Sequence, residues 1–148
     1  MRFSQRRAHH GDHRAGERTV YADMRKCRCA RPVGSACAST AGESILAQRV
    51  SGVRNFGSYS CRNIYGAEHG RRSEHATADA VDIGAFTLDD GRVIAIAKAW
   101  PRNGIEARFL RDVHDGACRF FNAVLGPNYN HAHYDHFHLD RGRFRVCR

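Results

Sequence analysis

The chain has 148 residues, of which 42% are hydrophobic and 26% charged, a composition typical of a folded domain rather than a disordered segment. This length suits one domain with its own buried core. No apolar run approaches the roughly 20 residues needed to cross a bilayer, so the sequence predicts no transmembrane segment.

The net charge of +9 is concentrated at the N-terminus. Residues 1–31 hold nine Lys or Arg against three Asp or Glu, a net charge of +6, whereas residues 32–148 carry only +3. Basic arms bind nucleic acid in some proteins. This arm lacks interleaved aromatic residues and a periodic apolar pattern, so we expect a disordered segment and no nucleic-acid partner. A weakly basic body suits an anionic polymer such as the cell wall.

Short elements open the predicted domain, residues 32–148. Ala41–Val50 is expected to form a short helix. Val53–Cys61 carries aromatic and β-favouring residues and is predicted as a strand entering the body. Residues 62–79 combine glycines, charges and few apolar side chains, which predicts a loop.

A β-hairpin is predicted next. Ala80–Phe86 and Arg92–Ala97 are rich in Val and Ile and form its arms, and Asp89-Asp90-Gly91 between them is a strong turn signal. Pro101 and Gly104 end the strand region.

The strongest helical pattern runs over Ile105–Leu125, where apolar side chains recur every three or four residues, and Gly126-Pro127 ends it. His114, between Asp112 and Asp115, is expected on its solvated face. Strands with an inserted helix and no βαβ repeat favour an α+β fold, a small, mainly antiparallel sheet with flanking helices.

Two segments carry candidate chemistry. His75 and Asp82 stand seven positions apart where the predicted loop becomes a strand, and His131–Asp140 packs four histidines and two carboxylates into ten residues. Zinc binds imidazole nitrogen and carboxylate oxygen, and catalytic sites combine three protein ligands with one open position. The histidine cluster alone is equally consistent with a non-specific metal sink. Its occurrence with the His–Asp pair predicts a metal site that joins distant segments.

Eight short segments between about residues 50 and 148 follow one another in a recognisable order. They are Phe56–Asn63, Ser73–Thr77, Ala80–Ile83, Phe109–Arg111, Ala117–Cys118, Val124–Pro127, Tyr129–Asn130 and Asp135–Asp140. This series resembles the bacterial extensin-like C-terminal domain. Through H-x(6)-D followed by H-x-H, it also resembles the group of zinc D-Ala-D-Ala peptidases, lysostaphin-type peptidases and the hedgehog signalling domain.

The resemblance implies a hedgehog/D,D-peptidase-like zinc fold and a zinc peptidase that cleaves a D-amino-acid bond in peptidoglycan or another cell-envelope polymer. It makes His75, Asp82 and His138 the Zn²⁺ ligands. Asp135 matches the general base, and Arg62 matches an arginine that faces the substrate or the developing oxyanion.

Other polar residues fall around these ligands. The resemblance implies that His136 lies behind the ligands or contacts substrate, and that Ser73 contacts substrate or supports a ligand. Asp140, on the same strand face as His138, would orient an imidazole. In an ideal strand Asp135 points away from that face, so it reaches the site only if the chain is irregular after Tyr134.

A non-catalytic, zinc-stabilised cell-envelope binding module is the alternative, because the hedgehog domain keeps zinc without an evident peptidase role. The two functions differ at the fourth metal position. An enzyme leaves it open towards Asp135 and Arg62, whereas a structural site fills it with a side chain such as His133 or His136.

Six cysteines bear on the compartment. No C-x-x-C pair is present, which disfavours a zinc ribbon. Cys118–Cys147 is the preferred disulfide and Cys37–Cys61 a plausible one, although spacing alone does not fix the pairing. Disulfides indicate an oxidising compartment, and the resemblance implies a periplasmic or cell-envelope monomer. Residues 1–31 show no apolar export signal, so we expect a shortened or altered N-terminus.

Overall fold

The computed structural model describes residues 45–148, so the predicted arm 1–31 and Cys37 lie outside the described residues. Residues 41–44 of the predicted helix Ala41–Val50 also lie outside them. In its described part only Ile45 and Leu46 are helical, and Val50 opens a strand. The strands are β1 (Val50–Gly57), β2 (Ala80–Leu88), β3 (Val93–Ala95), β4 (Ala123–Leu125), β5 (Phe137–Asp140) and β6 (Val146–Cys147). The helices are η2 (Ile64–Gly66), η3 (Glu74–Thr77), α3 (Ile96–Ala99), α4 (Ile105–Ala117) and η4 (His131–His133).

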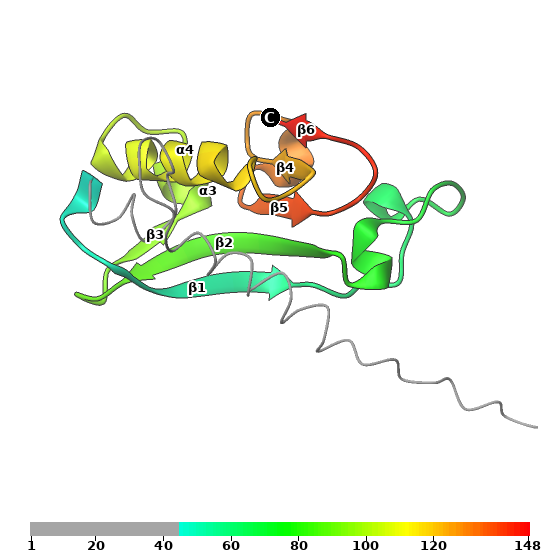
Figure 1. The fold of residues 1–148 in the computed structure, drawn as a ribbon, viewed down its shortest axis with the longest axis horizontal. Helices are drawn as coiled ribbons and strands as arrows, with labels where there is room; N and C mark the ends of the chain where they lie inside the picture. Colours follow the sequence, from blue (N-terminus) through cyan, green and yellow to red (C-terminus); the bar gives the residue numbers. More distant parts are fainter. Residues whose placement is uncertain (1–44) are drawn as a thin grey trace, which may run out of the picture.

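One six-stranded sheet organises the chain, with β1, β2, β5, β4 and β6 side by side in that order (Figure 1). The short strand β3 pairs with the later part of β2, and β5 pairs with its earlier part. All pairings are antiparallel except that of β4 with β6. A small mixed α/β domain with few helices is therefore confirmed, and its likeness to the hedgehog fold stays a prediction.

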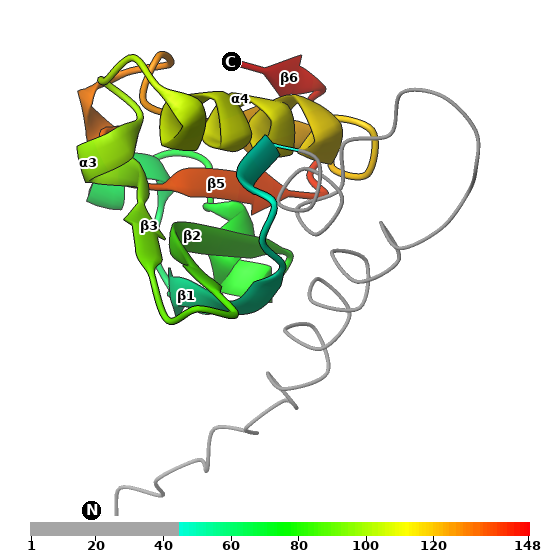
Figure 2. The same ribbon diagram turned by 90° about the vertical axis from the view of Figure 1, so that its left-hand side faces the viewer.

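Strand alternation gives the sheet a hydrophobic face. Side chains at alternate positions of β2 and β5 point to one side and are buried; they are Val81, Ile83, Phe137 and Leu139. Helix α4 lies along this face in Figures 1 and 2. Its side chains Phe109, Leu110 and Val113 belong to the same hydrophobic core. Burying each of these large side chains contributes roughly 1.5–3 kcal/mol.

The opposite face carries the polar residues. Asp82 on β2 pairs in register with His138 on β5, and Asp140 pairs with Ala80. Leu125 and Ala123 of β4 continue the same row. The segment that joins β1 to β2 holds η2 and η3 and lies at the right of Figure 1, where it brings His75 against this face.

The hairpin prediction is confirmed in outline, and the bounds of several predicted elements are wrong. The strand predicted over Val53–Cys61 is β1, which begins at Val50 and ends at Gly57. Asp89-Asp90-Gly91 forms the turn, but the second strand is only Val93–Ala95, since α3 begins at Ile96. Helix α4 ends at Ala117 rather than Leu125. The apolar pattern continues beyond that point because Ala123–Leu125 forms β4, which pairs with β5 and β6.

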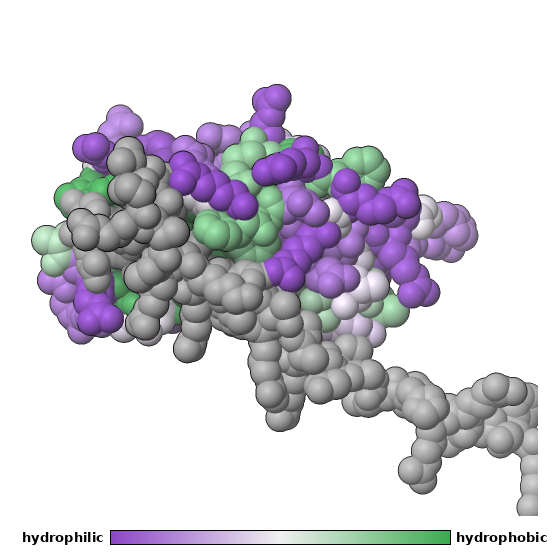
Figure 3. Space-filling view, viewed as in Figure 1, coloured by the Kyte–Doolittle hydropathy of each residue, from purple (hydrophilic) through white to green (hydrophobic). Residues whose placement is uncertain are grey.

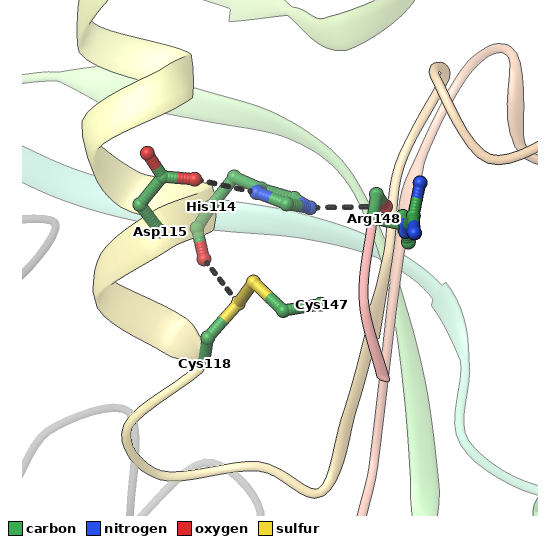
Figure 4. The surroundings of a disulfide bond; sticks show 5 residues. All are labelled: His114, Asp115, Cys118, Cys147 and Arg148. Atoms are coloured by element: carbon green, nitrogen blue, oxygen red, sulfur yellow. Dashed lines mark hydrogen bonds and ion pairs between the residues drawn. A yellow bond between two sulfur atoms is a disulfide. The ribbon is translucent and has the colours of Figure 1, made fainter. Parts of the chain in front are cut away.

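The C-terminal strand is tied to α4. The predicted disulfide Cys118–Cys147 is present, with Cα atoms 5.8 Å apart (Figure 4). The alternative partner of Cys61 lies outside the described residues, so the Cys37–Cys61 pairing stays a prediction.

The prediction that His114 lies on a solvated face is wrong. The residue is only 5% exposed, and its ring packs edge-on against Trp100 and Phe137. Its ring nitrogens lie 3.0 Å from Asp115 Oδ1 and 3.2 Å from the Arg148 carbonyl oxygen (Figure 4). His114 is thus a polar core residue whose hydrogen bonds fix the end of the chain.

Hydrophilic side chains dominate the face in Figure 3, with apolar side chains gathered in smaller patches. Within residues 45–148, none of the helices is long and apolar enough to cross a membrane.

Candidate metal centre

Three elements place the candidate ligands. His75 lies on η3, where its backbone N–H donates to Ser73 Oγ at 3.3 Å, so Ser73 caps this turn. Ala78 adopts a left-handed conformation (φ 59°) that ends the turn and leads into β2. Asp82 and His138 are cross-strand neighbours on β2 and β5. The rigid sheet therefore holds two of the groups, and the turn supplies the third.

The three side chains meet in an almost equilateral triangle. His75 Nε2 lies 3.1 Å from Asp82 Oδ1 and 3.1 Å from His138 Nδ1, and the third edge, from His138 Nδ1 to Asp82 Oδ1, is 3.0 Å. Tetrahedral zinc with bonds of about 2.0–2.1 Å separates its ligand atoms by about 3.3–3.4 Å. An expansion of about 0.3 Å would make the triangle one face of such a tetrahedron.

The outer nitrogen of each imidazole is already engaged. His75 Nδ1 lies 3.0 Å from the Ser58 carbonyl oxygen, which can only accept, so Nδ1 carries the proton. His138 Nε2 lies 2.9 Å from Asp140 Oδ2 and donates to that carboxylate. When both rings are neutral, their remaining lone pairs therefore face Asp82 inside the triangle. This is how metal-binding histidines are held in proteins.

The surrounding charges shift two pKa values in the metal-free protein. Burial opposes the charge on Asp82, but hydrogen bonds from His138 and His75 outweigh it and hold the pKa of this carboxyl well below its usual range. Burial likewise opposes a charged His138, yet hydrogen bonds to Asp140 and Asp82 raise its pKa to about 9. Without a metal, His138 is thus protonated at neutral pH and lies between the carboxylates of Asp82 and Asp140.

The triangle leaves a fourth position free of protein ligands. Among the described residues, the group at this site whose ligand atoms all lie within 4.8 Å of one another consists of His75, Asp82 and His138. Neither His133 nor His136 belongs to it, although His136 Nε2 comes within 3.6 Å of Asp82 Oδ1. The donor set of two imidazoles and one carboxylate could therefore hold a metal ion and leave one position open.

Asp135 reaches the centre through His136. The chain forms the turn η4 before β5 begins at Phe137, so the predicted irregularity after Tyr134 exists. Asp135 is nevertheless absent from the residues that line the cavity. Its Oδ1 lies 2.8 Å from His136 Nδ1, which leaves the His136 Nε2 lone pair on the side of Asp82.

The triangle opens into a cavity of about 860 Å³. Arg62 and Ser73 line it, as does His136. Within residues 45–148 the Arg62 side chain forms no ion pair, whereas Arg71, also in the wall, pairs with Glu74.

The sequence predicts no site role for three of the aromatic wall residues, and predicts the fourth, His133, only as a possible metal ligand. Tyr65, Tyr129, His133 and Phe144 line the cavity, and the Tyr and Phe rings are 42–61% exposed. Burial and the neighbouring histidine charges lower the pKa of His133 to about 4. No spacing rule marks these positions, because they come from three separate loops.

A second group of possible ligands, His114, Cys118 and Cys147, does not compete with the triangle. Both sulfur atoms are consumed by the disulfide (Figure 4).

Comparison with known families gives one match. The family described as extensin-like protein C-terminus matches residues 16–148. The match extends well upstream of residue 50, where the resemblance in the sequence fades, and enters the predicted basic arm. No curated protein and no solved structure matches the chain.

Proposed function

The chain belongs to the extensin-like protein C-terminus family, and on that premise we propose that it is a zinc-dependent peptidase of the cell envelope. We propose peptidoglycan as the substrate, cleaved at a bond formed by a D-amino acid in a carboxypeptidase or endopeptidase reaction. The Cys118–Cys147 disulfide supports an oxidising compartment such as the periplasm.

The orientation of the two imidazoles carries this proposal. Ser58 and Asp140 bind the outer N–H groups of His75 and His138, so both inner lone pairs converge on Asp82 Oδ1 at 3.0–3.1 Å. Among common metals, zinc suits this mixture of imidazole and carboxylate ligands. Zinc bound here would lower the pKa of water towards about 7 and polarise a carbonyl group.

His136 is the group best placed to move the proton. Its Nε2 lies beside the triangle, and the Asp135 carboxylate holds its Nδ1–H. We assign His136 as the base that takes a proton from the attacking water at Nε2 and delivers it to the leaving amine. Asp135 orients this ring by accepting the Nδ1–H, so it is a positioning residue.

Arg62 supplies positive charge at the cavity wall. Because its side chain is exposed and forms no ion pair with the described residues, it is available to the substrate carbonyl oxygen or to a substrate carboxylate. Ser73 supports the site indirectly, because its hydroxyl caps the turn that carries His75.

Hydrolysis of defined peptides tests this function. We expect the zinc-loaded protein to cleave an N-acetylated peptide ending in D-Ala-D-Ala, or purified peptidoglycan, with products identified by mass spectrometry. Asp135→Asn and His136→Gln should each lower kcat roughly 10²–10⁴-fold while zinc stays bound, and the double variant should lose little more. His131→Gln, in the same segment but outside the cavity wall, is the matched control.

The exposed aromatic wall favours a second function, a zinc-stabilised module that binds the polymer without cleaving it. Under this function peptidoglycan binds the wild type and the Asp135→Asn variant equally, and neither releases products. Product release by the wild type alone would exclude it.

A further inference from the structure

His133 presents an unused acceptor to the cavity beside the metal centre. The residue is only 7% exposed, yet it lines the cavity wall. Its Nδ1 lies 2.7 Å from Asn130 Oδ1, and that oxygen also accepts the Ala132 N–H at 3.0 Å, which fixes the orientation of the amide. His133 Nδ1 therefore donates, and Nε2 carries the lone pair.

This lone pair has no protein partner among residues 45–148. It is not sealed inside the protein either, since Ser58 Oγ is the buried side-chain atom without a partner in that part of the chain. A largely buried acceptor of this kind is costly to leave unpaired, so it needs a donor from a ligand or from water.

Two tyrosines flank the acceptor. The His133 ring lies edge-on to Tyr65 and Tyr129, with ring centroids 6.4 and 5.4 Å away. Asn130 Nδ2 donates to Tyr65 Oη at 2.8 Å, so one side chain holds both His133 and Tyr65 in place. These contacts define an acceptor subsite, made of Tyr65, Tyr129 and His133.

The acceptor subsite is adjacent to the metal triangle. The His133 and His138 ring centroids are 5.9 Å apart. An extended peptide advances about 3.3–3.6 Å per residue, so a chain whose scissile carbonyl lies at the triangle places a neighbouring residue at His133.

The cavity chemistry indicates which donor fits. A substrate carbonyl or carboxylate would face a lone pair, which is repulsive. An ammonium group would lie in the same cavity as Arg62, which forms no ion pair within residues 45–148. The carboxylates of the wall are already engaged, Glu74 with Arg71, and Asp82 and Asp140 with the histidines. A neutral amide N–H avoids both conflicts.

We propose that His133 Nε2 accepts a hydrogen bond from a backbone N–H of the peptide substrate within two residues of the scissile bond, with Tyr65 and Tyr129 packed against that residue. This inference rests on the proposed peptidase function in one respect, that the ligand is a peptide. It makes His133 a specificity-determining residue.

Binding of a non-hydrolysable peptide tests the subsite apart from catalysis. The probe is N-acetyl-L-Lys-D-Ala-D-Ala with its last amide replaced by a ketomethylene group, titrated calorimetrically into the zinc-loaded protein. His133→Phe keeps a ring but loses the acceptor, and should bind roughly 10–100-fold more weakly. His133→Gln retains an acceptor and should recover most of the affinity. His131→Phe, exposed in the same turn and outside the cavity wall, should bind like the wild type.

Replacing single N–H groups of the probe by ester oxygens identifies the donor. One of these replacements should weaken binding to the wild type by the same roughly 10–100-fold as His133→Phe does. The same replacement should not weaken binding to the His133→Phe variant any further, because that variant already lacks the acceptor. For hydrolysis of the parent peptide, His133→Phe should raise KM while kcat changes little.

Several results would overturn the inference: no binding of the probe by the wild type, equal binding by His133→Phe, or His133-dependent binding of a peptide-free glycan strand, which would indicate a sugar hydroxyl. Failure of the proposed function looks different. In that case the parent peptide is not hydrolysed, whereas binding of the analogue still depends on His133.

Discussion

His138 lies between the carboxylates of Asp82 and Asp140, and a proton and the proposed metal ion would compete for its Nδ1. Its Nε2 faces Asp140 and its Nδ1 faces Asp82, at 2.9 and 3.0 Å. In the metal-free protein burial opposes the charged ring, but hydrogen bonds to both carboxylates outweigh it and raise the pKa of His138 to about 9, so both nitrogens carry hydrogen at neutral pH. Zinc needs the Nδ1 lone pair, so metal binding near neutral pH must release this proton.

The metal-free protein should therefore lose stability as the solution becomes alkaline. The folded pKa of His138, about 9, lies above the unfolded value of about 6.5. Its stabilisation is thus fully present below pH 6.5 and is lost as pH rises through 9. We expect the free energy of unfolding by urea, measured in EDTA, to fall by roughly 1–3 kcal/mol between pH 6 and pH 9.5.

Asp140→Asn is the matched variant, because it removes the charge that faces His138 Nε2 while an amide oxygen can still accept the hydrogen bond. Its unfolding free energy should vary less over the same pH range. An equal fall in both proteins would show that His138 is not the responsible group.

At this scale the sequence predicted the clustering of His75, Asp82 and His138 better than the positions of the residues around them. The spacing of His75 and Asp82, and the strand alternation that puts Asp140 beside His138, depend only on local geometry. The turn η4 breaks the alternation before Phe137, so the contact of Asp135 with His136 and the position of His133 follow from loop packing, which no local pattern encodes.

Among the elements, β2 pairs with three strands, β1, β3 and β5, and carries a glycine beside the site. Gly84 lies two residues after Asp82 on the same face, and the Phe56 ring lies directly over it. Phe56 in turn meets His136 edge-on, with ring centroids 6.0 Å apart. The glycine thus lets β1 support the candidate base.

Gly84→Ala should disturb the site more than the fold. A Cβ there would overlap the Phe56 ring, which is 57% exposed and can rotate away, so we expect a stability loss under about 2 kcal/mol. The ring-current shift of the His136 ring protons, measured by NMR, should change, and peptide hydrolysis should fall.

Gly52→Ala on β1 is the control, since its Cβ would meet Thr87 no closer than 3.6 Å. Unchanged His136 signals in Gly84→Ala would contradict the supporting role of Phe56.

Element prediction succeeded where local and tertiary preferences agree. The turn at Asp89–Gly91 and the start of α4 follow from local sequence. The end of α4 does not, because Phe120, Phe121 and Val124 continue a helical period by chance while backbone pairing with β5 and β6 draws Ala123–Leu125 into the sheet. His114 was misjudged because its acidic neighbours mask its place on the buried stripe, four residues after Leu110.

Over the whole molecule, the C-terminal segment closes one side of the cavity and is anchored on the opposite face of the sheet. Gly142, Phe144 and Val146 line the cavity, while the next residue, Cys147, is bonded to Cys118 at the end of α4. The disulfide therefore links the cavity wall to the hydrophobic core.

Removing this crosslink should destabilise the protein without destroying the metal site. The bond joins residues 29 positions apart, and closing a loop of that size stabilises a protein by roughly 3–4 kcal/mol. We expect the double variant Cys118→Ser/Cys147→Ser to lose about this much in urea unfolding while it still binds zinc, because the sheet holds His138 on β5 and the C-terminal residues 141–148 carry none of the three ligands. Dithiothreitol should destabilise the wild type and leave the double variant unchanged; sensitivity of both would point to another disulfide.

The zinc content of the purified protein, measured by elemental analysis after dialysis, tests the central claim most directly. We predict about one Zn²⁺ per chain in the wild type, loss of the metal in His75→Ala, Asp82→Ala and His138→Ala, and retention in His69→Ala, which changes an exposed loop histidine. Circular dichroism would establish that each variant is folded. A folded wild type without stoichiometric metal, or ligand variants that keep it, would contradict the zinc centre and the peptidase function built on it.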